Sequence, residues 1–227
     1  MSRLGLPVPP GFTLTTEACR IYLRTGRFPD GLMDEVARQL AIVEEEIGKR
    51  LGDPDDPLLV SVRSRAPVSM PGMMDTILNL GLNDAAVHGL AHRTGDERFA
   101  LDSYRRLIQM FGSVVLRVES EEFEEALSAL KDECGIGDDS GLDAEEIRGL
   151  VFTYKMIVEE EAGRTFPEDP REQLEFAIRA VFDSWNNDRA KAYRKEFGIP
   201  EDLGTAVTVQ AMERKRLFFS QAERKER

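Results

Sequence analysis

Cysteine and histidine are scarce in this sequence. Its 227 residues include two cysteines, Cys19 and Cys134, and two histidines, His88 and His92. Two distant cysteines without metal-type spacing exclude a disulfide scaffold and favour a reducing, cytoplasmic location. The histidines are four residues apart on an expected helix, but Gly89 stands where the metalloprotease pattern needs a glutamate. We therefore interpret them as residues of a solvated helix face.

Long apolar runs and an excess of positive charge are also absent. No apolar run approaches the ~20 residues of a membrane-spanning helix, and the first residues lack the layout of a signal peptide. Acidic residues outnumber basic ones by 42 to 30, which gives a formal net charge of -12. This balance argues against general binding to nucleic acid or to anionic membranes, although a local basic cluster can still bind ATP. The glycine-rich P-loop and dinucleotide motifs and the serine or cysteine nucleophile motifs are missing.

The residues that are present predict an α+β fold dominated by helix. Short apolar or alternating segments at 58–62, 76–82 and 204–212 are typical of strands. A helix is expected from Asp30, and Thr15 or Thr16 is expected to cap a shorter one before it. We divide the chain into a first α+β part (1–96), a helical subdomain (97–197) and a returning strand with a basic tail (198–227).

Within the helical part, periodicity predicts one long helical stretch over about 98–133. It is expected to bend near Gly112, with Phe99 and Phe111 facing inward. Further helices are expected to begin at Asp143 and Asp169, and Asn83 or Asp84 is expected to cap the helix that precedes this region. Because short strands need partners, segments 58–62 and 204–212 are predicted to share one sheet, with exposed apolar surface near 207–209.

The run "SVRSRAPVSMPGMMDT" (61–76) has an unusual composition, with arginines, prolines, a glycine and methionines directly after a strand, which suggests a ligand or a partner. Arg63 and Arg65 follow a strand, and guanidinium groups match phosphate oxygens in a bidentate way. Hydroxyl donors and a permissive backbone accompany them at Ser64, Ser69, Gly72 and Thr76. Two interpretations stay open: a phosphate site, or a rim loop whose methionines fill the core while its arginines are solvated.

Several segments in order resemble the amino-terminal, ATP-binding part of the pyruvate, phosphate dikinase family. They are "GLPVPPGFTLTTEAC", "LLVSVRSRAPVSMPGMMDTILNLGLND", "YRRLIQMFGSVV", "FPEDPREQL", "AVFDSWNNDRAKAYR" and "GTAVTVQAM". The resemblance implies part of an ATP-grasp-type nucleotide-binding domain with an inserted helical subdomain. It also implies that Arg63 contacts the ATP phosphates and that the loop Ser69–Thr76, with Gly72, Met73 and Asp75, covers them. The complete family enzyme converts ATP, phosphate and pyruvate to AMP, pyrophosphate and phosphoenolpyruvate with magnesium.

The departures from the family pattern set further expectations. In the family, a glycine-rich segment with an ATP-binding lysine precedes the position of Met1, and strands with acidic metal ligands follow that of Met212, so we expect this sequence to lack both. Residues 213–227 instead carry six basic and three acidic residues and do not resemble the family. Arg65 stands where the family usually has glycine, and neither histidine corresponds to the phosphocarrier histidine.

We therefore expect a dikinase fragment that is not catalytic alone, with a second chain as a possible source of the missing domains. Two other interpretations are a non-catalytic module that binds a partner or a nucleotide, and a decayed gene product.

Overall fold

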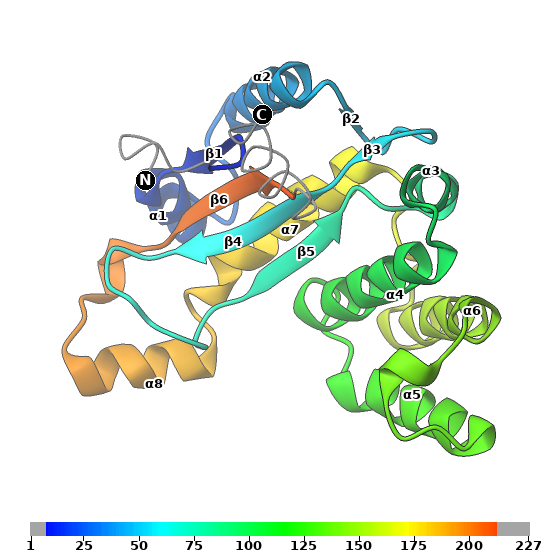
Figure 1. Ribbon diagram of the computed structural model, residues 1–227. Coiled ribbons are helices and arrows are strands. Elements are labelled where there is room, and N and C mark those ends of the chain that lie inside the picture. Colours follow the sequence, from blue (N-terminus) through cyan, green and yellow to red (C-terminus); the bar gives the residue numbers. More distant parts are fainter. Residues whose placement is uncertain (1–7, 213–227) are drawn as a thin grey trace, which may run out of the picture.

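A small antiparallel sheet and eight α-helices make up the computed structural model, which describes residues 8–212 (Figure 1). The strands are β1 (Gly11–Leu14), β2 (Arg50–Leu51), β3 (Pro57–Leu58), β4 (Val60–Arg65), β5 (Thr76–Leu80) and β6 (Ala206–Ala211). The helices are α1 (Thr16–Thr25), α2 (Leu32–Ile47), α3 (Asp84–Thr94), α4 (Glu97–Val114), α5 (Ser120–Cys134), α6 (Ala144–Ala162), α7 (Pro170–Ser184) and α8 (Asp188–Phe197). The fold is α+β with helix dominant, as the sequence predicts.

Strands from both ends of the described chain meet in one four-stranded sheet. Its order is β1-β6-β4-β5 and every neighbouring pair is antiparallel, whereas β2 and β3 form a separate two-stranded pair. The pairing of β4 with β6 confirms that segments 58–62 and 204–212 share a sheet. The predicted exposed apolar surface near Val207 and Val209 is wrong, since both side chains are buried. The reason is that β6 lies inside the sheet, between β1 and β4, and that helices α1 and α7 pack against it.

Capping residues begin several helices where the sequence places them. The Asn83 side chain accepts hydrogen bonds from two backbone N–H groups at the start of α3, and Asp143 forms a reciprocal capping box at the start of α6. Asp169 caps α7, with Pro170 in the first turn, where its missing N–H costs nothing. Thr15 occupies the N-cap position of α1 as expected, but its side chain makes no capping hydrogen bond.

The helical stretch expected over 98–133 is two helices that fold back on one another. Helix α4 ends at Val114 and α5 begins at Ser120. Arg117, in the connection between them, has a φ of 61°, in a region that non-glycine residues rarely adopt. Gly112 lies inside α4, where an added Cβ would come within 2.6 Å of the Phe123 ring. The glycine therefore lets α5 approach α4 closely rather than marking the break. Phe99 is 37% exposed, which corrects its predicted inward position.

The helices of the middle region have two different packing partners. Helices α3, α4, α5 and α6 pack on one another, and α4 also lies beside β5, whereas α7 crosses one face of the sheet (Figure 1). Residues 97–197 contain no strand, but the predicted boundaries at 97 and 197 stay a prediction. No helix within residues 8–212 is long and apolar enough to cross a membrane.

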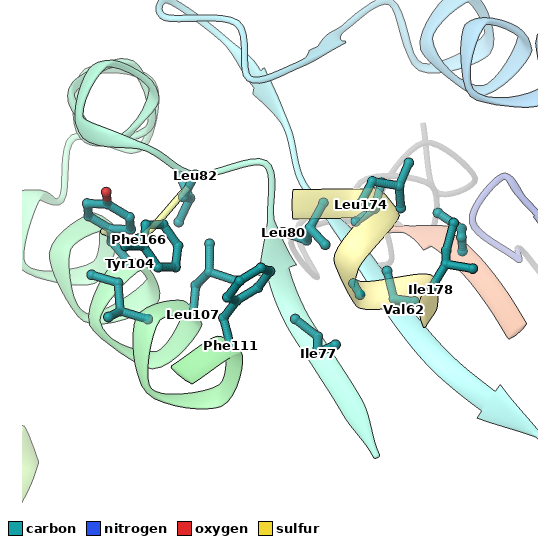
Figure 2. Close-up of a cluster of buried hydrophobic side chains, with 14 of the residues drawn as sticks. Val62, Ile77, Leu80, Leu82, Tyr104, Leu107, Phe111, Phe166, Leu174 and Ile178 are labelled. Atoms are coloured by element: carbon teal, nitrogen blue, oxygen red, sulfur yellow. The ribbon is translucent and has the colours of Figure 1, made fainter. Parts of the chain in front are cut away.

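Side chains of α4, β5 and α7 join the helical group to the sheet. Figure 2 shows Leu107 and Phe111 of α4 on one side of β5, and Leu174 and Ile178 of α7 near Val62 of β4. All five are almost completely buried, and they belong to one continuous hydrophobic cluster. The burial of this apolar surface is the main force that holds the two parts together.

A charged group reinforces that joint at its edge. The Lys155 ammonium lies 2.6 Å from carboxylate oxygens of both Asp84 and Glu168. The Tyr104 hydroxyl donates to the same two carboxylates, over 3.1 Å to Asp84 and 3.3 Å to Glu168. Four separate segments, namely α3, α4, α6 and the turn before α7, therefore meet at one point.

A buried ion pair inside α4 makes stability sensitive to acid. The Arg105 side chain is 3% exposed and lies 2.8 Å from Asp102 and 3.5 Å from Asp139. Burial of the Asp102 carboxyl opposes its ionisation, but hydrogen bonds and charge from Arg105 and Arg106 outweigh this and lower the pKa of Asp102. The stabilisation is therefore complete above the unfolded-state pKa of about 3.9 and is lost as pH falls through the folded-state value.

Replacing Asp102 with asparagine is expected to lower the free energy of unfolding by about 3 kcal/mol at neutral pH, because Arg105 stays buried with weaker charge compensation. In acid, where Asp102 is protonated, the difference between the two proteins should disappear. Urea unfolding at both pH values measures this, with Asp132→Asn on the exposed side of α5 as the control. An Asp102→Asn effect that persists unchanged in acid would contradict the ion-pair explanation.

Candidate functional site

The two faces of the four-stranded sheet differ in chemistry. Directly paired residues share a face, and successive residues along a strand alternate between faces. Val62 pairs with Val209, and Val209 pairs with Phe12, which places these apolar side chains on the face that α7 covers. The row one residue further along must therefore lie on the opposite face.

That opposite row is polar across all four strands. Thr13 of β1 pairs with Thr208 of β6, Thr208 with Arg63 of β4, and Arg63 with Thr76 of β5. The hydroxyl oxygens of Thr13 and Thr208 are 3.2 Å apart, and Thr13, Arg63 and Thr76 are exposed. We call these four residues the polar row.

The Arg63 guanidinium is available to bind a ligand. Among the described residues no carboxylate forms an ion pair with it and no group forms a hydrogen bond with its side chain. Guanidinium groups bind phosphate and carboxylate oxygens bidentately, and the flanking threonine hydroxyls can donate further bonds. The arrangement therefore suits an anion with several oxygens.

The segment between β4 and β5, residues 66–75, forms a loop that we call the methionine loop. Its tip is a tight turn in which the Met73 N–H donates to the Met70 carbonyl over 3.2 Å. Pro71 and Gly72 occupy the two central positions, and Gly72 has a φ of 73°, as a type II turn requires. Because paired strands flank the loop, Arg63 and Thr76 lie opposite each other at its base.

A cleft opens beneath the methionine loop, with a volume of about 830 Å³. Its lining combines the loop with the ends of β1, β4 and β6 and includes Thr13, Thr15, Ser64, Arg65, Ser69 and Met70. This volume falls within the range typical of small-molecule sites, and the polar groups converge at one end of the sheet.

The structure distributes the predicted site residues over four places. Arg63 and Thr76 stand in the polar row, and Arg65 and Ser69 line the cleft. Gly72 shapes the turn at the loop tip, and Met73 packs against the buried cluster of Met70, Trp185 and Ala190.

Asp75 lies apart from the cleft. It lines a second hollow of about 460 Å³ beside the ends of α4 and α7. Burial raises the pKa of Asp75, and Arg189, with a nitrogen 3.8 Å from its carboxylate, offsets this only partly. The assignment of all these residues to a phosphate site stays a prediction.

Sequence reasoning missed Thr13 and Thr208. Each lies in a short alternating segment, "GFTL" or "AVTVQA", in which threonines point away from the apolar face. Period-two alternation was therefore a usable signal for their face, but the register that aligns them with Arg63 depends on strand pairing across most of the chain.

The described residues offer no ready metal site. Within residues 8–212 no group of three or more histidine, cysteine, aspartate or glutamate side chains is arranged to hold a metal ion. His88 and His92 are exposed on α3, and Gly89 between them packs against the backbone of Pro54. This agrees with the interpretation of the histidines as a solvated helix face.

Comparison with known proteins gives one consistent family. Residues 22–222 match the family described as pyruvate phosphate dikinase, AMP/ATP-binding domain. The chain is 54% identical over 212 residues to a pyruvate, phosphate dikinase of Giardia intestinalis and 50% identical over 214 residues to one of Clostridium symbiosum. Each alignment covers 93% of this chain but 24% of the relative.

The chain therefore spans about a quarter of the length of these relatives. The match also includes residues 213–222, so the expectation that the family likeness stops at Met212 is wrong. Because the family match covers residues 22–222, the chain belongs to the pyruvate phosphate dikinase AMP/ATP-binding domain family.

Proposed function

We propose that the polar row and the cleft beneath the methionine loop bind the phosphate chain of ATP. The observation that carries this proposal is Arg63, an exposed guanidinium without a partner among the described residues, in a row of hydroxyls at the base of the loop. Arg65 and Ser69 extend the same set of donors into the cleft. Charge-assisted hydrogen bonds from such donors are about twice as strong as neutral ones, so this is where a polyanion would be held.

The family supports a wider proposal for the complete protein. We infer an ATP-grasp-type domain with an inserted helical subdomain at residues 97–197, acting in the cytoplasm. The relatives are called pyruvate, phosphate dikinases. The corresponding reaction consumes ATP, phosphate and pyruvate and yields AMP, pyrophosphate and phosphoenolpyruvate. Other domains, in the same or a second chain, would complete it.

Magnesium does not fit a site built from the described residues alone. Proteins usually hold Mg²⁺ through one or two carboxylates together with the substrate phosphates. The polar row contains no carboxylate, and Asp75 faces the second hollow rather than the cleft. The ion would therefore have to arrive with the nucleotide, and we assign no step to it here.

The polypeptide of residues 1–227 is expected to form no AMP when supplied with ATP, phosphate, pyruvate and magnesium. Phosphoryl transfer depends almost wholly on positioned cations around the phosphates. Removal of even one preorganised donor costs about 3 kcal/mol of transition-state stabilisation in other enzymes. Arg63 and Arg65, without a metal site, supply too few positive charges around the phosphates for phosphoryl transfer.

Chromatographic analysis of the nucleotides after long incubation measures this, with a reaction lacking protein as the blank. Saturation-transfer NMR at millimolar ATP should still detect weak binding that declines as salt is added. AMP formation above the blank would overturn the proposal that this chain needs further parts for catalysis. An absence of any binding signal would overturn the phosphate site itself.

A further inference from the structure

The methionine loop rests on a small separate core at the corner between α7 and α8. Met70 is 6% exposed and clusters with Trp185 and Ala190, and Met73 and Met74 pack against the same cluster. Figure 1 shows the connection between β4 and β5 passing beside α8 before it enters β5. This explains the run of methionines, because their flexible side chains can fill an irregular space under a loop.

A single asparagine ties the loop backbone to this corner. The Asn187 side-chain amide donates to the Met73 carbonyl over 3.0 Å. Its side-chain oxygen accepts from the Ala190 N–H over 2.7 Å, which caps α8. One residue therefore fixes both the start of a helix and the middle of the loop.

Trp185 is itself held from several sides. Its indole N–H donates to the Glu201 carbonyl over 2.8 Å, and the Arg194 guanidinium lies 4.2 Å from the ring centroid. Arg194 also donates to the Trp185 carbonyl, and it is 2% exposed. Its Nε has no hydrogen-bond partner, and burial lowers the pKa of Arg194. A buried guanidinium with one unpaired N–H is costly, but its contacts with the ring and with the Trp185 carbonyl fix the position of Trp185.

We propose that Trp185, Asn187 and Arg194 form a seat that positions the methionine loop over the cleft, and that phosphate bound there stabilises the loop over Trp185, which is 1% exposed in this structure. The second part rests on the proposed function. A loop held in place before binding loses less conformational freedom on binding, so the seat raises affinity for the phosphate chain. Coupling between two sites is reciprocal, so a bound phosphate must in turn stabilise the seated loop.

The chain provides its own reporter, since Trp185 is the only tryptophan among the 227 residues. Inorganic tripolyphosphate with magnesium is a suitable probe because it carries the phosphate chain without a base that absorbs ultraviolet light. Its binding to the unmodified polypeptide should reduce quenching of Trp185 fluorescence by acrylamide. Binding detected by calorimetry that leaves the quenching unchanged would overturn the coupling.

Asn187→Asp separates the loop contact from the helix cap. Aspartate caps helices about as well as asparagine but lacks the amide donor to Met73. Asn186→Asp adds the same charge one residue earlier and serves as the control. Loss of one hydrogen bond of ordinary strength predicts about fivefold weaker binding of tripolyphosphate for Asn187→Asp relative to the control.

The rate of trypsin cleavage after Arg65, at the start of the methionine loop, measures how firmly the seat holds the loop in the absence of any ligand. Cleavage should be several times faster in Asn187→Asp than in Asn186→Asp, at equal thermal stability. Equal cleavage and equal quenching in the two variants would overturn the seat. If the unmodified chain binds no tripolyphosphate, the proposed function fails, and the cleavage comparison alone decides whether the seat exists.

Discussion

Replacing Phe111 with alanine is expected to lower the free energy of unfolding by about 4 kcal/mol, the middle of the range for a buried phenylalanine. The side chain is completely buried, and its ring centroid lies 5.3 Å from that of Phe166 in an edge-to-face arrangement. Figure 2 places it between α4 and β5, where the helical group meets the sheet. A cavity there would remove contacts on both sides of the joint, and neither side can easily collapse into it.

The chain contains a matched control for this substitution. Phe152 lies on α6 with 67% of its surface exposed, so Phe152→Ala removes the same atoms from water-facing surface. Its effect should stay within about 0.5 kcal/mol, as for ordinary surface substitutions. Urea unfolding of the three proteins gives the comparison. Equal effects at the two positions would show that the helical group and the sheet do not share the core described above.

Replacing Arg63 with alanine is expected to weaken binding of magnesium-ATP by about 30-fold, because charged hydrogen bonds contribute about 2 kcal/mol each. The residue sits in the middle of the polar row, between Thr208 and Thr76. No neighbouring arginine occupies an equivalent place, since Arg65 pairs with Ala206 further along β4. The stability of the fold should be unchanged, because Arg63 is exposed and makes no ion pair among the described residues.

Much of the fold could be predicted because local signals agree with the global pattern. The alternation in β6 and the apolar run of β4 predicted two strands, and their shortness required a shared sheet. The starts of α3, α6 and α7 were predictable because Asn83, Asp143 and Asp169 have side chains that bond to helix N–H groups.

Features that depend on distant contacts were missed. The break after α4 carries no proline or glycine, and Arg117 adopts its left-handed conformation without any local signal. The burial of Val207 and Val209 depends on β1, which follows a proline-rich stretch and lies about two hundred residues earlier. The family resemblance implies that the loop containing Asp75 covers the ATP phosphates, yet Asp75 lines another hollow. The reason is that Asn187, at the start of α8, holds the loop backbone at Met73.

Calorimetric titration of the 227-residue polypeptide with magnesium-ATP tests the central claim most directly. The unmodified chain and Arg63→Ala should be compared with Arg148→Ala, which removes an exposed arginine from α6 in the helical group. We expect weak binding, with a dissociation constant well above the micromolar range, that is weakened about 30-fold in Arg63→Ala, kept in Arg148→Ala and reduced by added salt. Equal binding by Arg63→Ala and the unmodified chain would contradict the phosphate site. Micromolar affinity of the unmodified chain would contradict the conclusion that these residues form only part of it.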